Sequence, residues 1–235
     1  MKQKSIPLRH RLQDDWRRWR LRGKTRYFCI GRNKTGTTSL KVAFEQLGFV
    51  VGRQRTAKLL ADEDYFAGRF DRILRYCETA EVFQDAPFSY PDTYREVDRA
   101  FPGSKFILTV RDNPEQWYQS LVSFHAKRFG RNGKPPTIDD IRALESGGDI
   151  QGMSINFMKV HGTPENDLYN REITIAHYEK FNREVMDYFR NRPEDLLVIN
   201  VAVPEDYQRF LHFIGVASGE DGFPWANRTS EGRRG

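Results

Sequence analysis

Residues 29–40, "CIGRNKTGTTSL", connect the end of a predicted apolar strand to the start of a predicted helix. Gly31 and Gly36 bracket a short turn, and glycines in such a turn let backbone N–H groups approach a phosphate closely. In the common nucleoside-triphosphate loop, G-x-x-x-x-G-K-[S/T], a lysine directly follows the second glycine. Here Thr37 has that place and Lys34 lies inside the loop. The stretch predicts a phosphate site of another kind, with a tight threonine-capped turn as the alternative.

Apolar strands and amphipathic helices alternate along the rest of the chain. We predict strands at 26–31, 49–52, 80–87, 105–110 and 195–201, and helices at 37–47, 57–78 (broken near Gly68), 93–101, from Asn113 and Pro114 onward, 168–190 and 204–214. This alternation indicates an α/β fold of three layers, with a mostly parallel central sheet flanked by helices on both faces. Ligands of such folds bind beyond the carboxyl ends of the strands.

Two further strand ends carry groups suited to chemistry. Arg111 ends the strand 105–110, and with Ser120 on the following helix it offers a guanidinium and a hydroxyl to a second phosphate. Its alternative is a surface ion pair, and the neighbouring Asp112 supports a magnesium site only weakly. Asp85 ends the strand 80–87 and is placed to take a proton from an acceptor hydroxyl, unless it only caps the following turn. His125 is the competing base.

Composition and charge narrow the class of protein. Apolar residues make up 38% of the 235 residues and aromatic residues 13%, which is enough for a substantial core. The apolar stretches are too short for a membrane span, and the two cysteines, Cys29 and Cys77, do not indicate a disulfide framework. We therefore expect a cytoplasmic protein.

The positive charge is concentrated in an N-terminal arm, residues 1–25. Residues 1–26 carry ten Lys and Arg against two Asp, a net +8 that leaves −2 for the rest, because the total is +6. A slightly acidic body argues against nucleic-acid binding by the fold. One helical face of the arm carries two leucines and two tryptophans, Leu8, Leu12, Trp16 and Trp19. This pattern predicts either a helix packed on its own domain or peripheral contact with an anionic membrane.

Taken together, the motifs resemble a known family. The loop "GRNKTGTTSL" is similar to the 5′-phosphosulfate loop, P-K-[T/S]-G-T-[T/S]-[W/S]-L, of sulfotransferases that use 3′-phosphoadenosine-5′-phosphosulfate (PAPS). The stretch "FPGSKFILTVRDNPEQWYQS" (101–120) resembles their 3′-phosphate motif. The likeness runs from residue 26 to about 227, and we assign residues 26–235 to a sulfotransferase domain. The sequence departs from the family pattern at two points. Asn33 replaces the usual proline, and Ser120 follows Arg111 by nine positions, where eight are common.

The resemblance implies a P-loop-like sulfotransferase fold, PAPS as donor, 3′-phosphoadenosine-5′-phosphate (PAP) as product and no metal. Lys34 would stabilise the departing phosphate and Asp85 would act as base, at a position where cytosolic members carry histidine. The donor-binding residues implied are Arg32, Asn33, Lys34, Thr35, Gly36, Thr37, Thr38, Ser39, Arg111, Ser120, Asn227 and Arg228. The last two belong to "FPWANRTS" (223–230), which resembles a segment that closes over the nucleotide.

Other functions stay open at this stage. A P-loop small-molecule kinase would need ATP and magnesium, and a catalytically inactive nucleotide-binding module would bind without transferring. The acceptor, whether a small molecule, carbohydrate or lipid, is expected to contact residues 53–80 and 130–165. The second stretch is rich in Gly, Pro and Asp with little periodicity, which predicts a mobile insertion or lid.

Overall fold

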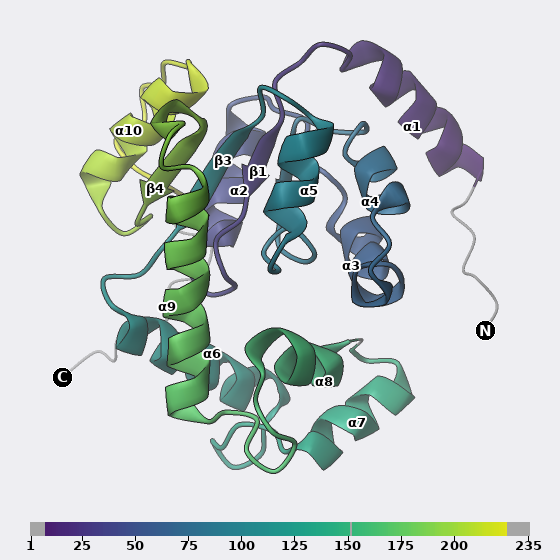
Figure 1. Cartoon of the computed structure of the whole chain (residues 1–235), viewed down its shortest axis with the longest axis vertical. Coiled ribbons are helices and arrows are strands. Elements are labelled where there is room, and N and C mark those ends of the chain that lie inside the picture. Colours follow the sequence, from purple (N-terminus) through teal and green to yellow (C-terminus); the bar gives the residue numbers. More distant parts are fainter. Residues whose placement is uncertain (1–7, 151, 225–235) are drawn as a thin grey trace.

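A sheet of four parallel strands forms the centre of the molecule. The structure, a computed structural model, describes residues 8–150 and 152–224. The sheet has the order β2-β1-β3-β4, with β1 at Tyr27–Cys29, β2 at Val82–Gln84, β3 at Lys105–Thr109 and β4 at Leu196–Ile199 (Figure 1). The strand predicted at 49–52 is reduced to one bridge, between Val51 and Val82. The other four predicted strands are confirmed.

Helices connect the strands and cover both faces of the sheet. They are α1 (Leu8–Arg20), α2 (Thr37–Gln46), α3 (Gln54–Glu63), α4 (Asp71–Tyr76), α5 (Thr93–Ala100), α6 (Pro114–Phe129), α7 (Ile138–Gly147), α8 (Met153–Ile155), α9 (Arg171–Tyr188) and α10 (Pro204–Ile214). Shorter turns are the 3-10 segments η1 (Tyr65–Ala67) and η3 (Pro193–Asp195) and the π-helical segment η2 (Asn156–His161). Gly68 interrupts the helical stretch 57–78 as expected, in the left-handed conformation at φ 67°.

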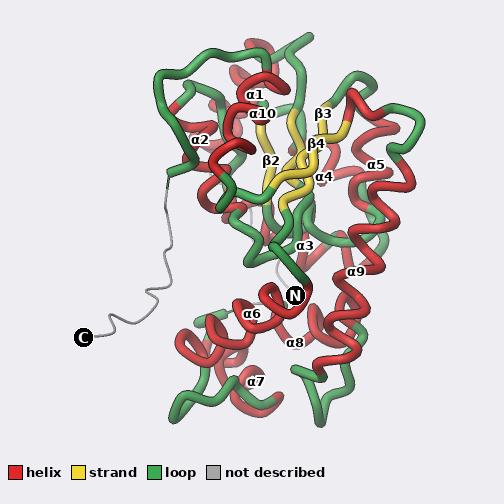
Figure 2. Tube along the Cα trace, turned by 90° about the vertical axis from the view of Figure 1, so that its left-hand side faces the viewer, coloured by secondary structure: helices red, strands yellow, loops and turns green. Residues whose placement is uncertain are grey.

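Alternation along the strands produces two cores. On one face Phe28 stacks between Phe83 and Phe106, each with ring centroids 5.5 Å away. On the other face Tyr27 and Cys29 pack in the core formed with α2 and α10. Figure 2 shows the strands between α2 and α10 on one side and α5 and α9 on the other. Because both faces are covered, most strand positions are apolar, and Gln84, Lys105 and Thr109 at strand ends are the exceptions. The predicted three-layer α/β fold is confirmed.

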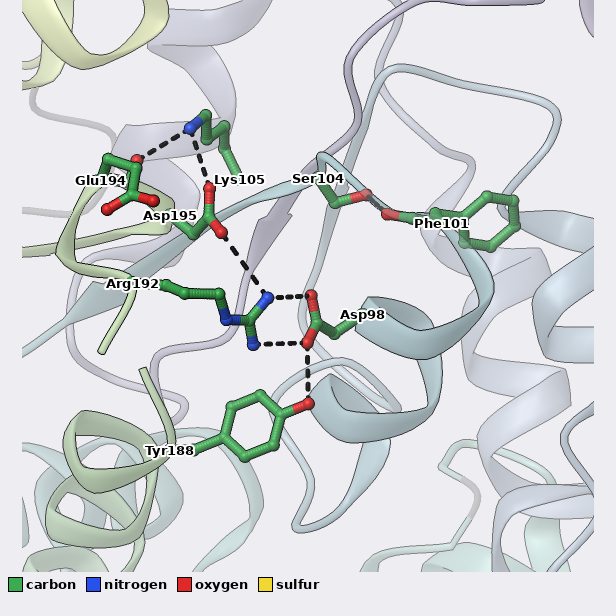
Figure 3. Close-up of polar contacts among 8 residues, drawn as sticks. All are labelled: Asp98, Phe101, Ser104, Lys105, Tyr188, Arg192, Glu194 and Asp195. Atoms are coloured by element: carbon green, nitrogen blue, oxygen red, sulfur yellow. Dashed lines mark hydrogen bonds and ion pairs between the residues drawn. The ribbon is translucent and has the colours of Figure 1, made fainter. Parts of the chain in front are cut away.

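A polar network lies at the amino-terminal ends of strands β3 and β4, opposite to the carboxyl ends considered above. Arg192 and Asp98 pair through two contacts of 2.7 and 3.2 Å, and Tyr188 donates a third hydrogen bond to Asp98 (Figure 3). Lys105, the first residue of β3, contacts Asp195 just before β4. Although burial alone would raise it, the pKa of Asp98 is lowered by the Arg192 and Tyr188 hydrogen bonds. The network ties α5 and α9 to the start of two strands.

The segment 130–165 has more regular structure than expected. It contains α7, α8 and η2, which lie below α3 in Figure 1. Thr137 and Asp140 form a reciprocal capping box at the start of α7. Ile141 and Phe157 bury their side chains in a small core with Leu168. The low apolar periodicity of this stretch is compatible with helices, because a helix with one deeply buried position shows almost no apolar period. That the segment acts as a mobile insertion or lid stays a prediction.

Helix α1 lies against the body by one face only. Asp14 pairs with Arg53 at 2.7 Å, Arg18 pairs with Glu78 at 3.2 Å, and Leu21 is buried. The side chains of Trp16 and Trp19 are 53% and 71% exposed. The arm thus packs on its own domain, yet its tryptophans face away from it. In the described part of the chain, no helix has the length and apolar character needed to cross a membrane.

Candidate functional site

The loop after β1 is locked to the end of β3. A Cβ atom on Gly31 would lie 2.0 Å from the Thr109 hydroxyl, so only glycine fits at this approach. The Thr35 hydroxyl bonds both the Arg32 carbonyl and the Thr109 hydroxyl, each at 2.5 Å. Thr35 is thereby a support of the loop. Its hydroxyl, expected at the phosphate, is used within the protein.

Helix α2 begins directly after this loop without a side-chain cap. Gly36 is the N-cap residue, with φ 100°, a conformation that favours glycine. The first amides of an α-helix have no partner within the helix, and the helix dipole places partial positive charge there. The amides of Thr37 and Thr38 therefore lie where an anion would be held, and Thr38 is exposed. The predicted sequence of strand, loop and helix is present here, and binding of an anion by it stays a prediction.

Lys34 and Arg111 lie next to each other at this site. The Arg111 side chain donates from Nε to the Lys34 carbonyl at 2.7 Å, so the loop after β1 contacts the residues after β3. The Lys34 ammonium lies 3.5 Å from the centroid of the Phe124 ring, a cation–π contact. Burial and the neighbouring Arg111 lower the pKa of Lys34, while Asp85 opposes them. Two positive side chains thus lie near each other beside the uncapped start of α2, an arrangement that favours an anion.

The other residues predicted to bind the donor offer their side chains less directly to a ligand, or lie outside the described residues. Ser120 lies on α6 and is half-buried, two turns beyond the helix start. Thr37 is nearly buried, and Asn33 uses its carbonyl to accept a 2.8 Å hydrogen bond from the Trp117 indole. Asn227 and Arg228 lie outside the described residues.

Asp85 follows β2 in a strained conformation, with φ 64°. Its Oδ2 atom accepts a hydrogen bond of 2.5 Å from the Gln54 side chain of α3, and its carbonyl accepts one from the Ser89 amide. Asp112 differs, because Asn200 and Gln116 each donate to one of its two carboxylate oxygens. Asp85 is thus the better placed carboxylate for proton transfer.

A cavity of about 220 Å³ opens beside Asp85. Side chains from the loop after β1, from α3, from α6 and from the 130–165 segment line it, and they include Asp85 and His125. Both proposed bases therefore face the same space. Lys34, Arg111 and Ser120 are not among the lining residues, which separates this cavity from the expected phosphate groups.

His125 is neutral in this environment. Burial, and next the charge of Lys34, lower its pKa to about 4, and its Nδ1 atom contacts the Tyr169 hydroxyl at 2.9 Å. A neutral imidazole can accept a proton, but a pKa of about 4 makes it a weak base at neutral pH.

Arg32 and His161 form a buried pair that sequence reasoning missed. Arg32 donates to the Ser89 carbonyl and lies 3.1 Å from His161 Nε2, across 129 positions of sequence. Because a guanidinium only donates, Nε2 accepts and the imidazole proton is on Nδ1, which has no partner among the described residues. Burial lowers the pKa of Arg32 to about 10 and that of His161 well below its usual value. Arg32 therefore faces the cavity and its histidine, not the expected donor phosphate.

Comparison with known proteins supports the family. No curated protein matches the chain. A family profile described as "Sulfotransferase domain" matches residues 26–232, close to the range over which the motifs above resemble sulfotransferases. The profile covers the sheet, the loop, both cations and the cavity. The chain belongs to the sulfotransferase domain family.

Proposed function

We propose that the protein transfers a sulfuryl group from PAPS to an acceptor hydroxyl or amine. The observation that carries the proposal is the contact of Arg111 with the Lys34 carbonyl beside the uncapped start of α2. This contact supports the proposal because two cations and helix amides then lie beyond the carboxyl ends of β1 and β3, where the connections leave toward opposite ends of the sheet. A nucleotide with phosphates at both its 5′ and 3′ positions matches this arrangement.

The donor-site residues then take distinct roles. The amides of the first turn of α2 hold the 5′-phosphate, and Lys34 neutralises charge that develops on the bridging oxygen as the sulfur–oxygen bond breaks. Arg111 and Ser120 hold the 3′-phosphate, with Asn227 and Arg228 closing over the nucleotide. The Lys34 ammonium lies over the Phe124 ring face at 3.5 Å, and the Asp85 carboxylate is near enough to raise its pKa.

Asp85 acts as the base in this proposal. The acceptor oxygen bonds to sulfur, its proton passes to the Asp85 carboxylate, and PAP leaves with the electron pair of the broken bond. Asp85→Asn should therefore lower turnover about 10²-fold or more while PAP affinity stays close to wild type. A fully active Asp85→Asn enzyme together with an inactive His125→Gln enzyme would transfer the role to His125.

Thermal shift with PAP alone, compared with ATP plus magnesium, tests the donor. We expect PAP without metal to stabilise the protein, since a ligand at 100 times its Kd adds about 2.7 kcal/mol. Stabilisation only by ATP plus magnesium would favour the small-molecule kinase. A protein that binds PAP but transfers nothing from PAPS to a broad acceptor panel would be a binding module.

The two buried free thiols, Cys29 and Cys77, agree with a reducing cytoplasmic setting.

A further inference from the structure

The cavity beside Asp85 has one polar wall, supplied by α3. Gln54, Lys58 and Asp62 all line the cavity, and they are spaced four positions apart on this helix. Residues with that spacing share one helix face, so the three side chains form a row. Gln54 donates to Asp85 at one end of the row. The row thus runs from the proposed reaction point into the cavity.

Helix α6 supplies a second row of different character. Trp117, Leu121, His125 and Phe129 also line the cavity at intervals of four positions. Three of these side chains are apolar, and the fourth is the neutral His125. A ligand in this cavity therefore meets hydrogen-bonding groups from α3 and apolar surface from α6.

The charges that line the cavity balance. Two are positive, Arg32 and Lys58, and two are negative, Asp62 and Asp85. The pKa of Arg32, about 10, keeps its guanidinium charged at neutral pH, and burial raises the pKa of Asp62 only to about 6. An anion would lie near two carboxylates and a cation near two positive groups, and like charges in contact are strongly unfavourable. A neutral ligand with several donors and acceptors can use all four.

One carboxylate oxygen of Asp62, the buried Oδ2 atom, has no hydrogen-bond partner among the described residues, although the charge of Lys58 acts on the group. Its Oδ1 atom packs so closely on Gly152 that a Cβ there would lie 2.1 Å away. Buried polar atoms are almost always hydrogen-bonded, so an unsatisfied carboxylate in a cavity wall suggests a donor from a ligand.

We propose that the acceptor is a neutral, polyhydroxylated ring of the glycoside type, with its hydroxyl edge along Gln54, Lys58 and Asp62 and its apolar face toward α6. The inference rests on the proposed sulfuryl transfer, because it treats this cavity as the acceptor site. Asp62 and Lys58 are specificity-determining residues in it, and Asp85 lies at the hydroxyl that is modified.

Three probes of equal shape and different charge test the proposal. They are 4-nitrophenyl β-glucoside, the matching β-glucuronide, which is anionic, and the matching 2-amino-2-deoxy-glucoside, which is cationic. We expect calorimetry in the presence of PAP to show that the neutral probe binds at least about tenfold more tightly than either charged probe. Equal or tighter binding of a charged probe overturns the proposal, and so does the absence of binding by the neutral one.

Charge-removing variants sharpen this test. Lys58→Gln should raise the affinity for the cationic probe about tenfold relative to wild type. Asp62→Asn should raise the affinity for the anionic probe by a similar factor. Lys180→Gln and Glu184→Gln, at an exposed pair on α9 outside the cavity, are matched controls that should leave the probe order unchanged. An unchanged order in both cavity variants, with melting temperatures near those of the controls, contradicts the assignment.

The outcomes separate this inference from the proposed function. If the neutral glycoside binds but no sulfuryl group is transferred from PAPS, the proposed function fails and the neutral-ring site stands. If transfer occurs to other acceptors while none of the three probes binds, the function stands and this inference fails.

Discussion

Lys34 is the residue on which the proposed reaction depends most. It lies in the loop with φ 72°, and its ammonium contacts the Phe124 ring. We predict that Lys34→Ala lowers kcat about 10²–10³-fold, because one preorganised donor to the transition state is lost. PAP affinity should fall much less, since the amides and Arg111 remain. Steady-state kinetics and calorimetry measure the two effects.

A matched control for this variant is available on the neighbouring helix. Lys41→Ala removes the same charge from α2, where Lys41 pairs with Glu45 at 2.9 Å on the surface. Its kcat should stay within a factor of two of wild type, as expected for a weak exposed pair. Wild-type turnover in Lys34→Ala would remove Lys34 from the mechanism.

At the scale of the elements, α6, η2 and α9 bring together three histidines that stay neutral. Burial is the main cause, and it lowers the pKa of His125 to about 4, that of His177 to about 3 and that of His161 in the same direction. The unfolded chain binds protons on these groups below about pH 6.5, while the folded protein does not. Stability should therefore be full above pH 6.5 and fall as the pH decreases toward 4.

Denaturant unfolding at pH 7 and pH 5 measures this effect. A single histidine with a pKa of about 3 in the folded state accounts for a loss of about 2 kcal/mol over that interval. His177→Gln should reduce the loss by about that amount, whatever its stability at pH 7. An equal pH dependence in the variant and the wild type would show that folding does not lower the pKa of His177.

The sequence predicted the elements that have a clear apolar pattern and missed those that lack one. The runs "KFILTV" and "DLLVINV" predicted β3 and β4, because strands covered on both faces are continuously apolar. Helices α7 and α8 were missed, although "TIDD" at the start of α7 carries a capping signal. The Arg32–His161 pair could not be predicted, because no local pattern links residues 129 positions apart.

At the scale of the whole molecule, charge and exposed aromatic surface meet on α1. Arg20 lies over the Trp16 ring at 5.1 Å, and Arg22 and Lys24 are exposed nearby. Tryptophan with basic residues on the exposed face of a helix is typical of binding to an anionic membrane surface. We predict that the protein co-sediments with vesicles of phosphatidylcholine and phosphatidylserine but not with phosphatidylcholine alone.

Variants of α1 identify the surface responsible. Trp16→Ala combined with Trp19→Ala should abolish co-sedimentation, and 0.5 M salt should weaken it. Phe124→Ala, at an exposed aromatic on α6, is a control that should leave it unchanged. Binding that persists in the double tryptophan variant would place the membrane contact on another surface. Failure of the wild type to co-sediment with the anionic vesicles would exclude the contact.

The central claim is that Lys34 and Arg111 form parts of one site for a nucleotide with two separate phosphates. Calorimetry of PAP and of adenosine 5′-phosphate, with wild type and Arg111→Ala and without metal, tests it most directly. The account predicts that wild type binds PAP at least about tenfold more tightly than adenosine 5′-phosphate, and that Arg111→Ala removes most of this difference. An unchanged preference for PAP in Arg111→Ala, or no preference in wild type, would contradict it.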